Sequence, residues 1–146
     1  MDREQMIRLL NLDLSWEYAA MIQYIQHAAM LTGAEYFAVI EEELQHAQEE
    51  HEHAVRLSDQ IQYLGGVPTV RVEEIRTSLD NREMLRQDLE AEYDALRRYL
   101  ERIEQLESLQ LYDVAQVVRE IALVEQEHII DLEKALGISK VNRAYR

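Results

Sequence analysis

The chain contains no cysteine and very few of the residues that make turns. Its 146 residues include one proline and four glycines. The lack of cysteine excludes a disulfide framework, a thiolate zinc site, an iron–sulfur cluster and a cysteine nucleophile. Because sheet proteins place glycine and proline in their many turns, the scarcity of both predicts long helices and an all-α fold.

Basic residues and long apolar runs are also lacking. Fifteen Lys and Arg residues against 29 Asp and Glu residues give a formal net charge of −14. This excess disfavours nucleic acid or an anionic membrane as a partner and suits a protein that gathers cations. No apolar run approaches the roughly 20 residues of a membrane span. Charged residues also stand where a signal peptide needs its apolar stretch. We therefore expect a soluble, cytoplasmic protein.

The few helix breakers divide the chain into four long helices. An apolar rhythm of three and four residues follows a capping box at Asp2 and Gln5. Gly65-Gly66-Val67-Pro68 is the strongest stop signal, and a second capping box begins at Asp80. The helices are expected over residues 2–31, 34–64, 80–107 and 110–136.

The lengths of the links between helices predict the topology. The first two helices are joined by a couple of residues, as are the last two, so each pair forms an antiparallel hairpin. Residues 67–80 are different, because 14 extended residues span up to about 46–50 Å, roughly one helix length. The sequence therefore predicts a ferritin-like four-helix bundle over residues 1–137, with one long crossover between the second and third helices. A short basic tail is expected over 138–146.

The sequence repeats itself after a shift of 75 positions. Each half has a glutamate in its first helix and, 33 residues later, a Glu-x-x-His motif in its second helix. The first-helix glutamates lie on the apolar stripes, and each is level with its partner across the hairpin. We expect six side chains to face one site in the core: Glu17, Glu50, His53, Glu92, Glu125 and His128.

Four carboxylates and two imidazoles in one core require a counter-charge. Buried without one, the carboxylates would cost many kcal/mol or take up protons. Two divalent ions cancel the four negative charges. Glutamate and histidine ligands without sulfur suit iron or manganese, and this arrangement on four helices is the di-iron carboxylate pattern. The sequence predicts two iron ions per chain, with manganese possible.

Several other residues near the predicted ligands are candidates for supporting the site. Glu43 and His46 form a third Glu-x-x-His motif that has no counterpart in the other half, and we expect it to support the site or to guide ions to it. Asp13 and Asp88 each lie one turn before a predicted ligand, where they are expected to hydrogen-bond a ligating histidine. Tyr24 is a core aromatic residue that is a candidate for electron donation to the metals.

These motifs resemble those of the bacterioferritins, within the ferritin-like di-iron family, as far as about residue 136. The resemblance implies that Glu17 and His53 hold one iron and that Glu92 and His128 hold the other. Glu50 and Glu125 would bridge the two ions, and Tyr24 would lie beside the centre. The segments that carry the resemblance are Gln23-Tyr24, Glu50-His51-Glu52-His53, Leu64 to Pro68, Met84-Leu85-Arg86 and Glu125-Gln126-Glu127-His128.

The chain departs from the bacterioferritin pattern in three places. The methionine through which bacterioferritins bind haem between subunits is His51 here, which makes haem doubtful. The histidine of the family's inner-surface iron site is Gln45, although Glu49 retains the neighbouring acid. The short fifth helix that lines the pores of the cage has little counterpart in the tail. The resemblance therefore leaves both a 24-subunit cage and a dimer open.

From these features we expect a ferroxidase that oxidises Fe²⁺ with O₂ or H₂O₂, for iron storage or detoxification. It would act as a homo-oligomer. The alternative is a rubrerythrin-like di-iron protein that reduces peroxide or acts as an oxidase, as a dimer without mineral storage. A third hypothesis is an acidic helical scaffold without catalytic activity.

Overall fold

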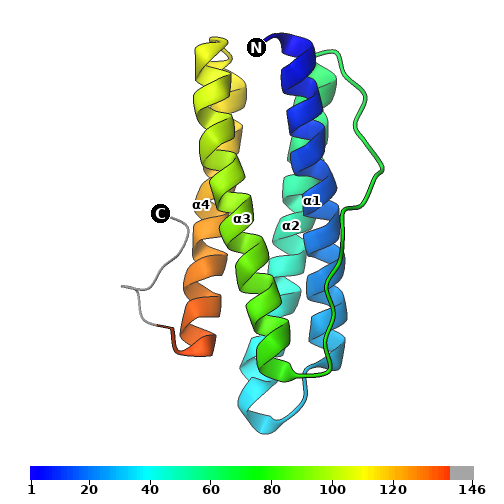
Figure 1. Cartoon of the computed structure of the whole chain (residues 1–146), viewed down its shortest axis with the longest axis vertical. Helices are drawn as coiled ribbons and strands as arrows, with labels where there is room; N and C mark the ends of the chain where they lie inside the picture. Colours follow the sequence, from blue (N-terminus) through cyan, green and yellow to red (C-terminus); the bar gives the residue numbers. More distant parts are fainter. Residues whose placement is uncertain (139–146) are drawn as a thin grey trace.

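The computed structural model describes residues 1–138, and every regular element within this range is helical. The elements are α1 (Arg3–Met30), η1 (Ala34–Tyr36), α2 (Phe37–Tyr63), α3 (Asn81–Ser108) and α4 (Tyr112–Leu136). They form one bundle in which α1 pairs with α2 and α3 pairs with α4 (Figure 1). The predicted all-α four-helix bundle is confirmed. The predicted basic tail lies, from residue 139 onward, outside the described residues.

The link between α2 and α3 runs along the length of α1 (Figure 1). Near its start, Asn11 on α1 donates to the carbonyl of Val67 (3.1 Å) and accepts from the amide of Thr69 (2.8 Å). Further along, the amide of Arg76 donates to Oε1 of Gln23 at 2.9 Å. The chain thus returns to the opposite end of the bundle before α3 begins. The predicted crossover, with α2 and α3 parallel, is confirmed.

The helix ends differ from the sequence prediction in three places. The first is the start of α2, at Phe37 rather than near residue 34, because the short 3₁₀ helix η1 occupies Ala34–Tyr36. Asp2 and Gln5 form the predicted capping box. Only half of the second box forms: Asp80 accepts from the amide of Glu83, but its own amide donates to Ser78 Oγ. The last helix begins at Tyr112 rather than near residue 110, because Gln110 has a positive φ of 62° in the turn.

Apolar side chains from all four helices fill the core. Buried acids and histidines interrupt this core. These buried polar side chains cost free energy that other interactions must offset.

Within residues 1–138, no helix combines the length and the apolar character that a membrane span requires.

A buried ion pair joins α1 to α3. Arg102 and Asp13 are 3% and 0% exposed, and the guanidinium donates to both carboxylate oxygens at 2.7 and 3.0 Å. The sequence prediction that Asp13 would bond a ligating histidine is wrong, because Arg102 occupies both oxygens. Unlike the ion pairs on the bundle surface, which are exposed to water, this pair is shielded from water.

Arg102→Met should destabilise the protein by about 3–5 kcal/mol, because it removes the guanidinium that bonds both oxygens of the buried Asp13 carboxylate. The midpoint of urea unfolding at fixed protein concentration measures this loss. Arg97→Met is the matched control on α3, since the Arg97–Asp94 pair is exposed and contributes little. Equal unfolding midpoints for the two variants would contradict the structural role assigned to the buried pair.

Candidate metal centre

The bundle brings all six predicted ligands together from four helices. Glu17 comes from α1, Glu50 and His53 from α2, Glu92 from α3, and Glu125 and His128 from α4; none is more than 4% exposed. They form two overlapping groups, and the potential ligand atoms within each lie within 4.8 Å of one another. The groups are Glu17, Glu50, His53 and Glu125, and Glu50, Glu92, Glu125 and His128.

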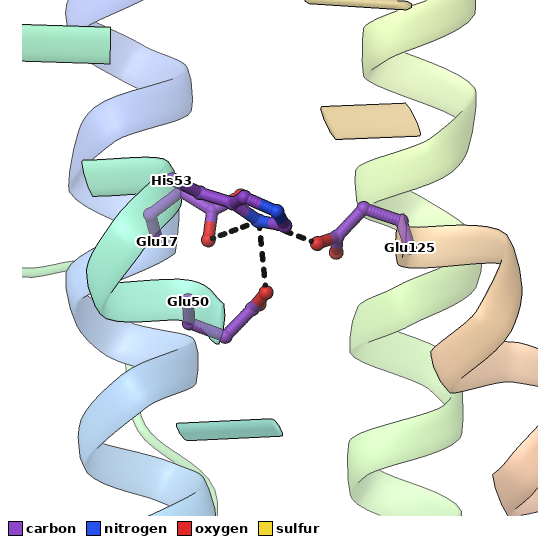
Figure 2. Close-up of side chains that lie close together, drawn as sticks. All are labelled: Glu17, Glu50, His53 and Glu125. Carbon is purple, nitrogen blue, oxygen red and sulfur yellow. Dashed lines mark ion pairs between the residues drawn. The ribbon is translucent and has the colours of Figure 1, made fainter. Parts of the chain in front are cut away.

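His53 lies at the centre of the first group (Figure 2). Its Nδ1 atom is 2.9 Å from Oε1 of Glu125, 3.1 Å from Oε1 of Glu50 and 3.6 Å from Oε2 of Glu17. The three carboxylates come from three different helices and converge on one nitrogen. Such convergence places four potential ligand atoms within reach of a single ion.

His128 occupies the matching position in the second group. Its Nδ1 atom is 3.4 Å from Oε2 of Glu92 and 3.7 Å from Oε1 of Glu50. Its other ring nitrogen, Nε2, lies 3.2 Å from Oε1 of Glu49 on α2. A carboxylate bonded to the far nitrogen of a histidine fixes the ring and leaves the near nitrogen free to ligate. From the sequence, Glu49 is expected only as an acid of the inner-surface iron site, so its contact with His128 is an addition from the structure.

The converging atoms lack hydrogen-bond partners, and this tests whether metal ions fit. Although carboxylates lie close to both, neither histidine Nδ1 makes a hydrogen bond of good geometry within the described residues, and the same holds for at least one oxygen of each glutamate. Buried acceptors without donors are costly, and a cation relieves all of them together. A donor set of four carboxylates and two imidazoles without sulfur fits iron or manganese. The chemistry of the site therefore matches two divalent ions.

Without ions, the centre keeps protons in place of metal charge. Burial and neighbouring carboxylates raise the pKa of Glu50 and of Glu125 well above the ordinary value. Burial opposes protonation of His53, but Glu17 and Glu125 outweigh it and raise its pKa to about 10. Burial also opposes ionisation of Glu92, which nevertheless has a pKa of about 2 because it pairs with His128. The metal-free core thus holds both neutral carboxyls and charged pairs.

Two tyrosines related by the 75-residue shift connect the halves of the centre. Tyr24 on α1 donates to Oε1 of Glu92 at 2.8 Å, and Tyr99 on α3 donates to Oε1 of Glu17. Burial, followed by the charge of the bonded glutamate, raises the pKa of both phenols well above 10. Each tyrosine therefore remains a proton donor that orients a carboxylate of the opposite hairpin.

The third Glu-x-x-His motif lies next to the centre. The ring of His46 stacks on that of His128, with centroids 4.0 Å apart, and its Nε2 atom is 3.1 Å from Asp131.

Two features around the centre differ from what the sequence predicts. The expectation that Asp88 bonds a ligating histidine is wrong, because Asp88 bonds His27 instead. Sequence reasoning also missed Arg102, although its place on the buried stripe, three residues after Tyr99, was a usable signal.

The unfolding free energy of the metal-free protein should fall as the pH rises from 5 to 7.5. In this range the fold retains protons on Glu50 and Glu125 that the unfolded chain releases near pH 4.5, and the raised pKa of His53 acts in the same direction above pH 6.5. Glu125→Gln replaces one of these carboxyls by an amide that does not titrate in this range. The unfolding free energy of this variant should therefore depend less on pH and should exceed that of the wild type at pH 7.5.

Urea unfolding after removal of metal measures this effect, with the exposed Glu127→Gln on α4 as the control. The expectation fails if the wild type and Glu125→Gln show the same pH dependence.

Comparisons with known proteins agree with the architecture and with the chemistry of the centre. The family model for the ferritin-like domain matches residues 7–140. A bacterioferritin of Brucella melitensis is 32% identical over 135 residues, covering 92% of this chain and 84% of that protein. A bacterioferritin of Mycobacterium tuberculosis is 31% identical over 133 residues, covering 90% of this chain and 84% of that protein.

A solved structure gives the same result. The crystal structure of a ferritin-like, diiron-carboxylate protein from Bacillus anthracis superposes with a TM-score of 0.89 at 30% identity. The match covers 93% of this chain and 99% of the other. The chain belongs to the ferritin-like family and is related to the bacterioferritins within it.

Proposed function

We propose that the protein is a ferroxidase that binds two Fe²⁺ ions at the six-residue centre and oxidises them with O₂ or H₂O₂. The observation that carries this proposal is the pair of four-ligand groups that share Glu50 and Glu125. Glu17 and His53 would hold one iron, Glu92 and His128 the other, and the two shared carboxylates would bridge them. Manganese fits the same ligands.

The charge and electron balance of the reaction fits the site. Two Fe²⁺ ions replace the protons of the metal-free centre and cancel the charge of four carboxylates. Each iron then gives one electron. The two electrons, with two protons, reduce O₂ to H₂O₂ or H₂O₂ to two waters. Since the two ligand groups share Glu50 and Glu125, two ions held there would lie side by side and would deliver the two electrons to one oxidant.

Tyr24 is proposed as a redox-active residue beside the centre. Its hydroxyl contacts the ligand Glu92, and its ring lies edge-on to His46 and His128, with centroids 5.0 and 6.1 Å away. Tyr99 makes the equivalent contact with Glu17, but no ring contact with either histidine is present among the described residues. The two tyrosines therefore differ in their surroundings although they share a hydrogen-bonding role.

We propose that the protein stores or detoxifies iron as a homo-oligomer. The relatives named as bacterioferritins support storage. Large apolar side chains exposed within the described range, among them Phe37 (72%), Tyr63 (63%) and Leu123 (61%), support burial against further copies of the chain. The alternative is a rubrerythrin-like dimer without mineral storage. A cage of 24 copies of the 17.2 kDa chain would have a mass near 413 kDa and a dimer near 34 kDa, so size-exclusion chromatography separates them.

Haem is not part of the proposal. His51, at the position of the haem methionine of the bacterioferritins, is exposed on α2. It lies in the wall of a surface cavity together with Tyr18 and Met21. An expected cytoplasmic location stays a prediction of the sequence.

Glu50→Ala should abolish the fast phase of iron oxidation, because it removes a ligand common to both groups. Stopped-flow absorbance after mixing anaerobic Fe²⁺-loaded protein with O₂ or H₂O₂ should show two Fe²⁺ consumed per chain in that phase for the wild type. Glu52→Ala, exposed on the same helix, is the control and should behave like the wild type. Fast oxidation that survives in Glu50→Ala would overturn the assignment.

Tyr24→Phe should slow the fast phase more than Tyr99→Phe does. Both changes remove one hydrogen bond to a ligand carboxylate, so the difference between them reports the redox role proposed for Tyr24. Rapid-freeze electron paramagnetic resonance should also detect a tyrosyl radical in the wild type that Tyr24→Phe lacks. Equal rates in the two variants, with no radical, would limit Tyr24 to orienting Glu92.

A further inference from the structure

The two halves of the bundle treat an equivalent buried aspartate differently. On one side, Asp13 lies between two arginines: Arg102 bonds both of its oxygens, and Nε of Arg98 is 3.8 Å from Oδ1. The 75-residue shift replaces Asp13 by Asp88, Arg98 by Gln23 and Arg102 by His27. One carboxylate therefore has two permanently charged partners, and its counterpart has none at these positions.

The second half also buries an additional acid. Glu43 on α2 occupies the position that matches Val118, a fully buried residue of α4. Its side chain is 1% exposed, and neither carboxylate oxygen has a hydrogen-bond donor in the described part of the chain. Since valine fills the equivalent position, the bundle does not need a carboxylate there for packing.

Glu43, His27 and Asp88 converge on one point. Their potential ligand atoms lie within 4.8 Å of one another, and all three side chains are buried. Two facing carboxylates cannot bond each other unless a proton or a cation lies between them. Burial, and then the charge of Asp88, raises the pKa of Glu43 to about 11, so in the absence of a cation Glu43 keeps its proton.

The surrounding bonds prepare His27 and Asp88 as ligands. Nε2 of His27 is 3.0 Å from the carbonyl oxygen of Arg76, an acceptor, so this nitrogen carries a proton. Nδ1 faces the oxygens of Asp88 at 2.9 and 3.0 Å. Gln23 donates to Oδ1 of Asp88 at 2.9 Å. A histidine whose far nitrogen donates to a backbone carbonyl is the usual arrangement around a bound metal.

We propose that His27 Nδ1, Glu43 and Asp88 form a third metal site that takes one divalent first-row transition-metal ion. Two carboxylates and one imidazole suit ions from Mn²⁺ to Zn²⁺. The ion displaces two protons, the one on Glu43 and the one that lies between Nδ1 of His27 and Asp88. It then cancels both carboxylate charges and gives the unpaired oxygens of Glu43 a partner. This site shares no residue with the six-residue centre, so it stands whether or not that centre oxidises iron.

A surface cavity supplies a route to this site. It has a volume of about 210 Å³ and lies between the first turns of α2 and the last turns of α4. Glu43 forms part of its wall, together with Glu42, His46 and Asp131. Glu42, Asp131 and His46 favour a cation in the cavity. A hydrated ion can therefore approach Glu43 without passing through the six-residue centre.

Anaerobic equilibrium dialysis of the full-length protein against Co²⁺, followed by metal analysis, tests the proposal. The wild type should bind three ions per chain and Glu43→Val should bind two. The exposed Glu41→Gln is the control on the same helix and should bind three. Glu50→Ala should lose ions of the six-residue centre and keep the third. Two ions in the wild type, or three in Glu43→Val, would overturn the third site.

Two further variants guard against misfolding. His27→Arg combined with Glu43→Val introduces the residues that the other half has at the matching positions 102 and 118, and Glu43→Gln keeps the shape of the side chain. Both should show wild-type circular dichroism and bind two ions. Anomalous diffraction from Co²⁺-soaked wild-type crystals should place one peak at His27 Nδ1, and its absence would overturn the site. If the six-residue centre binds no metal and the third site does, the wild type should instead bind one ion and Glu43→Val should bind none.

Discussion

Burial of like charges at one level of an apolar bundle is the constraint on which the rest of this structure depends. Each of Glu17, Glu50, Glu92 and Glu125 would be unfavourable alone in this core, and together they are more so. Ion pairs with histidines, hydrogen bonds from tyrosines and retained protons offset part of this cost. These substitutes leave several acceptors unpaired. A site that is incompletely satisfied in this way is suited to take up metal ions.

The internal repeat explains how such a centre is built from a short chain. Each hairpin supplies one glutamate and one Glu-x-x-His motif, and each also supplies a tyrosine that bonds the other hairpin's glutamate. Neither hairpin holds a complete four-ligand group, because Glu50 and Glu125 come from different hairpins and belong to both groups. Closing the bundle and assembling the centre are therefore the same event.

The differences between the halves carry as much information as the repeat. Arg102 bonds both carboxylate oxygens of Asp13, and this ion pair stabilises the contact between α1 and α3. The matching pair, Asp88 with His27, also contacts the crossover through the carbonyl of Arg76. The crossover thus does more than connect helices, since it orients a histidine inside the bundle. Glu43, without a counterpart in the other half, lies against this pair.

The sequence by itself determined the helices, the crossover and the six candidate ligands, because apolar periodicity, helix stops and the 75-residue repeat are local or regular signals. It did not reveal the partners of Asp13 and Asp88, the contact of Glu49 with His128, or the cluster around Glu43. Those depend on which side chains meet across distances in the chain that range from 16 positions, between His27 and Glu43, to 89 positions, between Asp13 and Arg102. Only the tertiary structure decided them, since the rotation and register of packed helices set such contacts, and helical periodicity specifies a face but not its partner.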